Sequence, residues 1–324
     1  MPRALARWLA SPWARVALTV GVFVALSRFV DLASLAARAR GADPVWLVAA
    51  VVMFGLDQAL GVYKWQLLLG GLGLEVGFGP LFRTATSGMF LSFFVPSALS
   101  ADLYKGVAAS RTLGAGAEVA SSIVLERLLG VASIVVVGLL SLSWLPRAVL
   151  GFDSAVTLGL AAAVLAGGLA GFLHADVLLR FLEGRLPRAF AGLAARLEDL
   201  ARAFGAYRRR RRTLVACFLL SLALQGTRCT ATWMIARSLG DATPFWAFLV
   251  FVPYLYMVNL LPFATSRIGL EQGAFVLLFA TVGMAPEVAV AVSLLSVLAG
   301  LVVALPGGLW LVTDRAALGT RSSR

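Results

Sequence analysis

Histidine and cysteine are scarce in this 324-residue chain, which holds one histidine and two cysteines. Because His174 stands alone, no histidine cluster and no histidine–cysteine zinc site can form. Cys217 and Cys229 share one apolar run, and helical geometry would separate them by about 18 Å, beyond the reach of a disulfide. We therefore expect no metal and no other cofactor.

A nucleotide-binding loop is also missing. The glycine-rich stretch 70–79, GGLGLEVGFG, lacks both the P-loop lysine and the GxGxxG spacing, so we expect a turn there. The chain by itself should not hydrolyse ATP. No nucleophile–base set emerges from the apolar runs either, and we expect no enzymatic activity.

Charge is low and hydrophobicity is high. Only 14% of residues are charged, 60% are hydrophobic and the mean hydropathy is +0.90, whereas about a quarter of a soluble chain is charged. The apolar residues form runs of roughly 17 to 25, long enough to cross a bilayer core of about 30 Å. The sequence predicts an all-α, polytopic integral membrane protein.

The apolar runs predict six to eight transmembrane helices in a single domain, 1–324. They lie at 13–30, 44–69, 119–142, 156–173, 213–239, 245–261, 268–284 and 288–312. We expect a first half at 13–173, a basic helix at 176–212, a second half at 213–312 and a tail at 313–324. Both termini are expected on the cytoplasmic side of the cell membrane.

The net charge of +12 also fits a membrane protein, with its densest basic cluster in residues 176–212. This segment contains ten arginines and only four acidic residues, an excess of positive charge that is typical of a cytoplasmic segment. Apolar residues three and four apart predict an amphipathic interfacial helix. Its last five arginines either hold anionic headgroups or simply fix the topology; they are Arg208, Arg209, Arg210, Arg211 and Arg212. No basic groove with interleaved aromatics indicates nucleic-acid binding.

Two polar, proline-containing stretches interrupt the apolar pattern, one in each half. Residues 92–106 read SFFVPSALSADLYKG, and residues 261–275 read LPFATSRIGLEQGAF. Paired interruptions of this kind indicate a transporter's binding site, where helix ends point partial positive charge at an anionic group. The alternative is an interfacial loop in each place. We predict that both stretches are broken or re-entrant segments of a pseudo-repeat and that they line a polar cavity.

Further charges lie inside the apolar runs. Asp57 and Lys64 are seven residues apart on one helix face, and the adjacent Glu126 and Arg127 point in different directions and need separate partners. Arg228 shares a stripe with small polar residues and is expected to contact phosphate. Because charge within a bilayer is costly, these residues should face a polar interior or pair across helices.

The order of these motifs resembles the lysylphosphatidylglycerol synthase transmembrane-region family, whose members are also described as flippase-like. The quoted stretches and SSIVLERLLG carry the resemblance over nearly the whole chain. Positions that match the family pattern are Pro96, Asp102, Glu126, Arg127, Pro262, Gly269 and Glu271. Ser100-Ala101 departs from the usual paired glycines, Lys105 replaces an arginine, and Arg267 intrudes in the second stretch.

The resemblance implies a membrane domain that moves or presents polar phospho- or glycolipids, without the soluble aminoacyl-transferase domain. We expect anionic headgroups as ligands, attracted by Lys105, Arg127, Arg228 and Arg267 and balanced by Asp102, Glu126 and Glu271. One alternative is a non-catalytic accessory subunit for a separately encoded transferase. Another is a small-anion carrier that uses the same residues.

Overall fold

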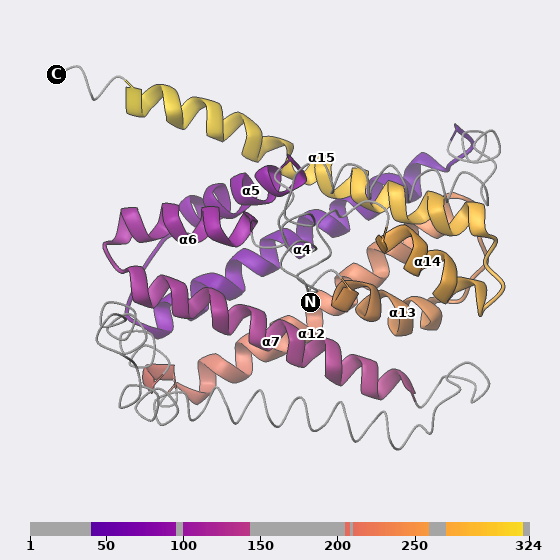
Figure 1. The fold of residues 1–324 in the computed structure, drawn as a ribbon, viewed down its shortest axis with the longest axis horizontal. Coiled ribbons are helices and arrows are strands. Elements are labelled where there is room, and N and C mark those ends of the chain that lie inside the picture. The colour runs from indigo at the N-terminus through magenta and orange to yellow at the C-terminus, as the bar shows by residue number, and fades with distance from the viewer. Residues whose placement is uncertain (1–39, 95–99, 143–204, 208–209, 259–269, 320–324) are drawn as a thin grey trace, which may run out of the picture. The chain divides into compact units, whose positions relative to one another are not determined.

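The computed structural model describes residues 40–94, 100–142, 205–207, 210–258 and 270–319 (Figure 1). Within these residues the regular structure is α-helical, which confirms the predicted all-α class. The helices are α4 (Pro44–Gly71), α5 (Phe78–Phe94), α6 (Ser100–Leu113), α7 (Gly116–Leu142), α12 (Arg211–Ser238), α13 (Phe245–Val258), α14 (Leu270–Ala280) and α15 (Pro286–Gly319).

Four of the described helices are long and apolar enough to cross a membrane. These are Pro44–Gly71, Gly116–Gly138, Arg211–Ser238 and Pro286–Leu311. They confirm four of the predicted spans and, with them, a polytopic membrane protein. Helix α15 runs further than expected, to Gly319, because no helix breaker follows the apolar run. The predicted spans 13–30 and 156–173 and most of the basic segment 176–212 lie outside the described residues.

The two proline-containing stretches overlap the ends of short helices. Residues 95–99 separate α5, of 17 residues, from α6, of 14, and residues 259–269 separate α13, of 14, from α14, of 11. A 14-residue helix is about 21 Å long, less than the ~30 Å bilayer core. Predicted apolar segments 245–261 and 268–284 thus contain helices shorter than a span, and α14 ends at Ala280 rather than near 284.

Local chemistry sets where α4 begins. Asp43 precedes Pro44, and its carboxylate accepts a hydrogen bond from the Val45 amide at 2.9 Å. Proline suits the first helical position because its missing N–H would lack a helical partner there anyway. An aspartate cap of this kind contributes about 1 kcal/mol to the helix.

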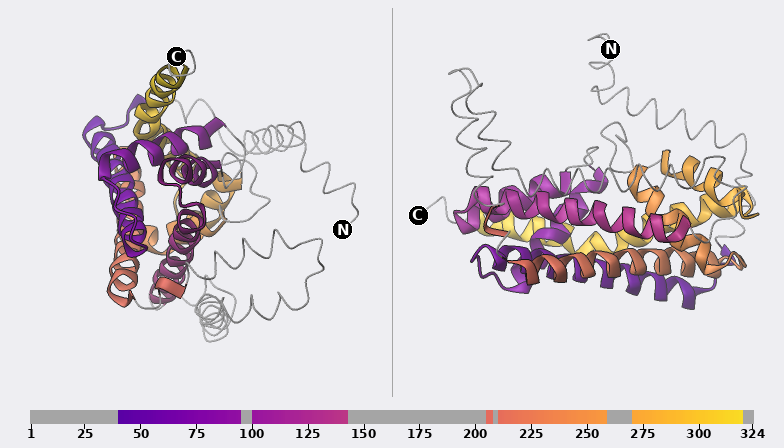
Figure 2. Two further views of the ribbon diagram at one scale, coloured as in Figure 1. Left: turned by 90° about the vertical axis from the view of Figure 1, so that its left-hand side faces the viewer. Right: turned by 90° about the horizontal axis from the view of Figure 1, so that it is seen from below.

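The chain divides into two compact units, and several helices contribute to both. Unit 1 comprises residues 1–57, 89–101 and 226–324, and unit 2 comprises 58–88 and 102–225. In unit 1, α14 packs against α13 and α15, which Figure 2 shows in orange to yellow. Phenylalanine rings join α14 to α13, where Phe279 contacts Phe248 and Phe251, and Phe275 stacks on Phe279 within α14. The sequence-based division into halves stays a prediction.

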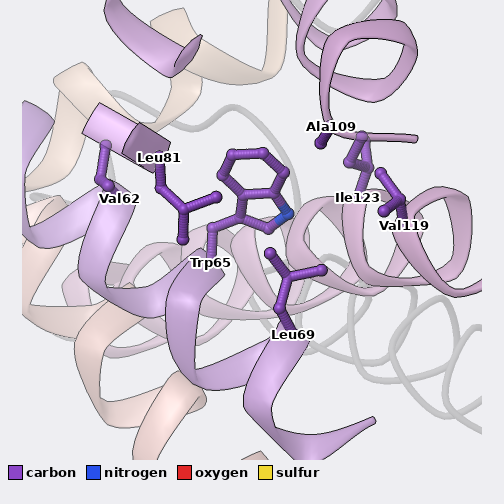
Figure 3. Packing of buried hydrophobic residues seen from close by; sticks show 7 residues of the cluster. All are labelled: Val62, Trp65, Leu69, Leu81, Ala109, Val119 and Ile123. Atoms are coloured by element: carbon purple, nitrogen blue, oxygen red, sulfur yellow. The ribbon is translucent and has the colours of Figure 1, made fainter. Parts of the chain in front are cut away.

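The core of unit 2 surrounds Trp65, which is fully buried (Figure 3). Four helices supply the cluster: Val62, Trp65 and Leu69 from α4, Leu81 from α5, Ala109 from α6, and Val119 and Ile123 from α7. A second buried cluster holds Tyr207, whose hydroxyl donates to the Leu68 carbonyl at 2.9 Å. Burial raises the pKa of the Tyr207 phenol above its usual range, so the hydroxyl remains a donor.

Candidate functional site

Helices α6 and α7 form an antiparallel hairpin that brings the polar residues of unit 2 together. Gly114 has φ of 65° and donates its N–H to the Ser110 carbonyl at 2.9 Å, which ends α6. A left-handed glycine is the usual way to stop a helix with this bond. Because α7 starts at Gly116, the turn between the two helices is short. Lys105, nine residues before Gly114 on α6, therefore lies near the turn of α7 that contains Glu126.

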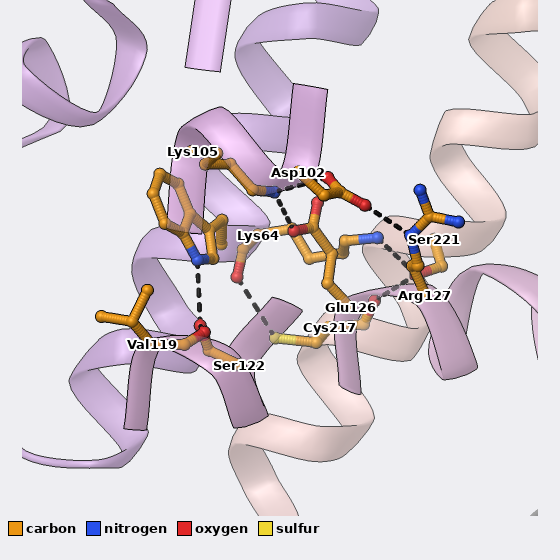
Figure 4. A network of polar contacts seen from close by, with 10 residues as sticks. Lys64, Asp102, Lys105, Val119, Ser122, Glu126, Arg127, Cys217 and Ser221 are labelled. Carbon is orange, nitrogen blue, oxygen red and sulfur yellow. Dashed lines mark hydrogen bonds and ion pairs between the residues drawn. The ribbon is translucent and has the colours of Figure 1, made fainter. Parts of the chain in front are cut away.

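Two ion pairs cross this hairpin (Figure 4). Lys105 Nζ donates to Glu126 Oε2 at 2.5 Å, and Arg127 Nε donates to Asp102 Oδ2. Lys105 also lies 3.6 Å from Asp102 Oδ1, one helical turn earlier on α6. The adjacent Glu126 and Arg127 therefore have separate partners, as predicted, and both partners come from α6. We call these four residues the quartet.

Trp65 of α4 forms the apolar wall behind the quartet. Lys105 Nζ lies 4.6 Å from the centroid of the indole ring, a cation–π contact. The indole N–H of Trp65 donates to Ser122 Oγ at 3.0 Å, one turn before Glu126 on α7. This hydrogen bond fixes the ring plane on which the ammonium group rests, since the ring cannot turn without losing it.

Lys64 adds another positive charge to the same network (Figure 4). Its side chain is buried, and Nζ donates to Ser221 Oγ of α12 at 3.3 Å. Together with the quartet this makes three cations and two carboxylates, a formal charge of +1 for the five residues.

Unit 1 contains a different polar arrangement on α4 and α12. Arg228 Nε lies 3.1 Å from Asp57 Oδ1, and Thr227 Oγ1 donates to Asp57 Oδ1 at 2.9 Å. The Arg228 guanidinium lies 4.9 Å from the ring centroid of Tyr256 on α13. Arg228 thus has a carboxylate partner and an aromatic face, and one formal charge of each sign is present.

The other predicted site residues do not belong to the quartet. Glu271 lies half-buried in the first turn of α14, beside the buried Gln272. Arg210, Arg211 and Arg212 are exposed at the start of α12. Pro96, Arg208, Arg209, Pro262, Arg267 and Gly269 lie outside the described residues. The structure brings Asp102, Lys105, Glu126 and Arg127 together, and the predicted cavity between the two proline-containing stretches stays a prediction.

Sequence reasoning did not include Trp65, Ser122 and Tyr256 in the site. A buried tryptophan or tyrosine in an apolar run looks like ordinary core or interfacial packing. The signal for Trp65 was its position next to Lys64, where a polar residue within a span already indicated a polar neighbourhood. Nothing in the sequence pairs Tyr256 with Arg228, because 28 residues separate them.

Within the described part of the chain, no group of three or more His, Cys, Asp or Glu side chains could hold a metal ion.

The family model described as lysylphosphatidylglycerol synthase TM region matches residues 13–308. It is the family that the motif order resembles, and the match includes every residue of the quartet. No curated protein and no solved structure matches the chain.

Proposed function

The chain belongs to the lysylphosphatidylglycerol synthase TM region family, and from this premise we propose that it is a lipid transporter of the cytoplasmic membrane. It would move or present polar, phosphate-bearing lipids from one leaflet to the other. The chemistry would be binding and displacement, so no covalent step and no cofactor is required. We further propose that both termini face the cytoplasm, as the arginine distribution favours.

One observation carries the proposal: a partly buried network of charged side chains lies inside an otherwise apolar helical protein. An ionised side chain at the bilayer centre costs at least about 2.5 kcal/mol, so charges kept there usually pair or serve function. The quartet contains two ion pairs, Lys105 with Glu126 and Arg127 with Asp102. A purely structural pair would need only one charge of each sign.

The location of the quartet supports transport over simple anchoring. Asp102 and Lys105 lie in the first two turns of α6, directly after residues 95–99. The first turn of a helix carries partial positive charge from its unpaired N–H groups, so it attracts anions. A headgroup would thus meet the helix start, the two cations of the quartet and their carboxylates within one region of unit 2.

The test is leaflet exchange in liposomes that contain the purified full chain. Fluorescent lipids with phosphatidylglycerol, phosphatidylethanolamine and uncharged glycolipid headgroups would be compared, with dithionite quenching as the readout. We expect exchange of a phosphate-bearing lipid to be at least tenfold faster than in empty liposomes. Asp102→Asn and Glu126→Gln should each remove most of that increase.

The matched control is Glu75→Gln, a carboxylate change at an exposed position in the turn after α4. Exchange by this variant should equal that of the wild type. If the folded wild-type protein accelerates exchange of no lipid, the transporter proposal is wrong. Exchange that proceeds unchanged in both carboxylate variants would remove the quartet from the transport site.

A further inference from the structure

We propose that Trp46, Trp233 and Phe245 form an interfacial anchor of unit 1, with their rings in the glycerol and ester region of the membrane lipids, in the leaflet opposite the cytoplasm. We call these three residues the aromatic cluster. The inference goes beyond the proposed function and does not depend on it, because it concerns the depth of the protein in the bilayer and not what the protein moves.

Three helices bring the aromatic cluster together. Trp46 lies in the first turn of α4, Trp233 lies in the last two turns of α12, and Phe245 is the first residue of α13. The ring centroid of Trp233 lies 5.6 Å from that of Trp46 and 5.6 Å from that of Phe245, both in edge-to-face contact. The Asp43 amide also donates to the Ser238 carbonyl at 2.8 Å, which holds the start of α4 against the end of α12. The three rings therefore form one packed group at this end of unit 1.

The rings of the aromatic cluster are packed together but not enclosed. Trp46 and Trp233 are half-buried, and Phe245 is 37% exposed. Within the described residues neither indole N–H of the cluster has an acceptor, whereas that of the enclosed Trp65 donates to Ser122. An indole ring with an apolar body and an unused donor suits the membrane interface, where lipid ester groups and water supply acceptors next to hydrocarbon.

Polar groups lie on one side of the aromatic cluster and exposed apolar groups on the other. At the end of α12, the exposed Arg237 donates to the Asp241 carbonyl at 3.2 Å, and the Asp241 carboxylate accepts from the Thr243 amide at 2.8 Å. Further along α4, Val48 and Val52 are 64% and 66% exposed, and on a helix long enough to span a bilayer such side chains face hydrocarbon. Polar, aromatic and then apolar is the order met on passing from water into a bilayer.

The spacing along α12 matches the thickness of a bilayer core. Its first turn contains the exposed Arg211 and Arg212, and Trp233 follows Arg212 by 21 residues. At about 1.5 Å per residue this is about 32 Å, close to the ~30 Å of the hydrocarbon. Arginines next to a span favour the cytoplasmic side, so the aromatic cluster near the other end of the helix belongs to the opposite leaflet.

Two exposed turns allow the leaflet to be tested without altering the aromatic cluster. Ala242 lies between α12 and α13, and Glu75 follows the other end of α4. The native Cys217 and Cys229 are buried, and replacing both by alanine removes their background. In sealed right-side-out membrane vesicles, a membrane-impermeant maleimide should label Ala242→Cys at least tenfold faster than Glu75→Cys, and permeabilisation should remove the difference. Faster labelling of Glu75→Cys, or equal labelling in sealed vesicles, would overturn the leaflet assignment.

The depth is tested by fluorine NMR on the full chain in lipid nanodiscs, with 5-fluorotryptophan at all eight tryptophan positions. Trp46→Phe and Trp233→Phe assign two of the resonances and keep a ring at each position. We expect a lipid with a nitroxide at carbon 5 of its acyl chain to broaden these two resonances at least twofold more than a lipid with the nitroxide at carbon 16. Trp65, which is fully buried in unit 2, is the matched control, and its resonance should be broadened less than theirs by the carbon-5 label.

Stronger broadening by the carbon-16 label would place the rings in the hydrocarbon, and no broadening by either lipid would place them inside protein. Each of these results would overturn the interfacial position. Should a phenylalanine substitution prevent folding, a spin label on Ala242→Cys identifies the tryptophan resonances at this end of unit 1 by proximity, and the two lipids are then compared on those resonances.

Failure of this inference differs from failure of transport, because neither test measures lipid exchange. An interfacial cluster in a protein that moves no lipid would support the inference and remove the transporter proposal. A transporter whose aromatic cluster fails both tests would do the reverse.

Discussion

The quartet in unit 2 and the Asp57–Arg228 pair in unit 1 contain the same kinds of side chain in different arrangements. Each contains a carboxylate paired with a cation, and each cation rests on an aromatic ring, Lys105 on Trp65 at 4.6 Å and Arg228 on Tyr256 at 4.9 Å. The unit 1 pair joins two long spans, α4 and α12, and contains one charge of each sign.

The quartet, by contrast, joins the short helix α6 to the long helix α7 and has a second carboxylate. A carboxylate with two alternative cations can change partner, whereas the Asp57 carboxylate has Arg228 and a neutral hydroxyl, that of Thr227. Paired charge is present in both regions and does not by itself assign the proposed transport to either of them. The two regions differ in that Asp102 has a second cation, Lys105, within reach.

The largest expected effect is on stability, at the unit 1 pair. Asp57→Ala should leave the partly buried Arg228 without its carboxylate, and removing one member of a buried pair costs about 3–5 kcal/mol. Because the Arg228 side chain retains some exposure, we expect a loss of stability at the lower end of this range. Thermal unfolding in detergent would measure it. The double variant Asp57→Leu/Arg228→Leu should recover most of the loss, and a double variant as unstable as Asp57→Ala would contradict this view.

Double variants can reverse the charges of an ion pair in each of the two regions. Asp57→Arg/Arg228→Asp keeps an ion pair between α4 and α12, and we expect at least half of wild-type lipid exchange. Asp102→Arg/Arg127→Asp also keeps a pair, but it places a carboxylate where the phosphate would bind, so exchange should fall at least tenfold. Liposome assays on both variants, with unfolding temperatures alongside, make the comparison. Equal loss in the two variants would mean that the regions do not differ in function.

A smaller effect is expected where α5 meets α15 in unit 1. A Cβ atom on Gly308 would come within 2.7–2.9 Å of the Phe90 ring, so Gly308→Ala requires the ring or the helix to shift. Overpacking of this kind costs about 1–3 kcal/mol. Gly55→Ala on α4 is the matched control, because nothing lies within 4 Å of the added Cβ. Equal unfolding temperatures for the two variants would show that the contact is easily relieved.

The sequence predicted the long spans well because composition and length alone decide whether a helix can cross a bilayer. Four spans appear within a few residues of their predicted ends. It also predicted that Glu126 and Arg127 need separate partners, since adjacent helical residues point in different directions. The identity of those partners depends on how α6 folds back at Gly114, and hydrophobic runs contain no such information.

Arg228 shows the limit of reasoning from residue type. An arginine within a span was expected to contact phosphate, and this stays a prediction; the structure places Asp57 and Tyr256 beside Arg228, 171 and 28 residues away in the chain. Partners at such separations are set by tertiary packing. Sequence patterns can indicate that a buried charge needs a partner, and only the fold indicates whether that partner is a protein side chain or a ligand.

The smallest expected effect comes from substituting the two aromatic residues, Trp65 and Tyr256, one at a time. Trp65→Phe keeps a ring beneath Lys105 but removes the indole N–H that donates to Ser122 at 3.0 Å, so Lys105 loses a fixed support. We expect a loss of about 1 kcal/mol in stability and a two- to threefold slower lipid exchange. Ser122→Ala should reproduce the slower exchange, because it breaks the same hydrogen bond from the other side. Tyr256→Phe keeps the ring face under Arg228 and should leave lipid exchange unchanged. If Tyr256→Phe slowed exchange as much as Trp65→Phe, the unit 1 pair would have to be counted as part of the transport site.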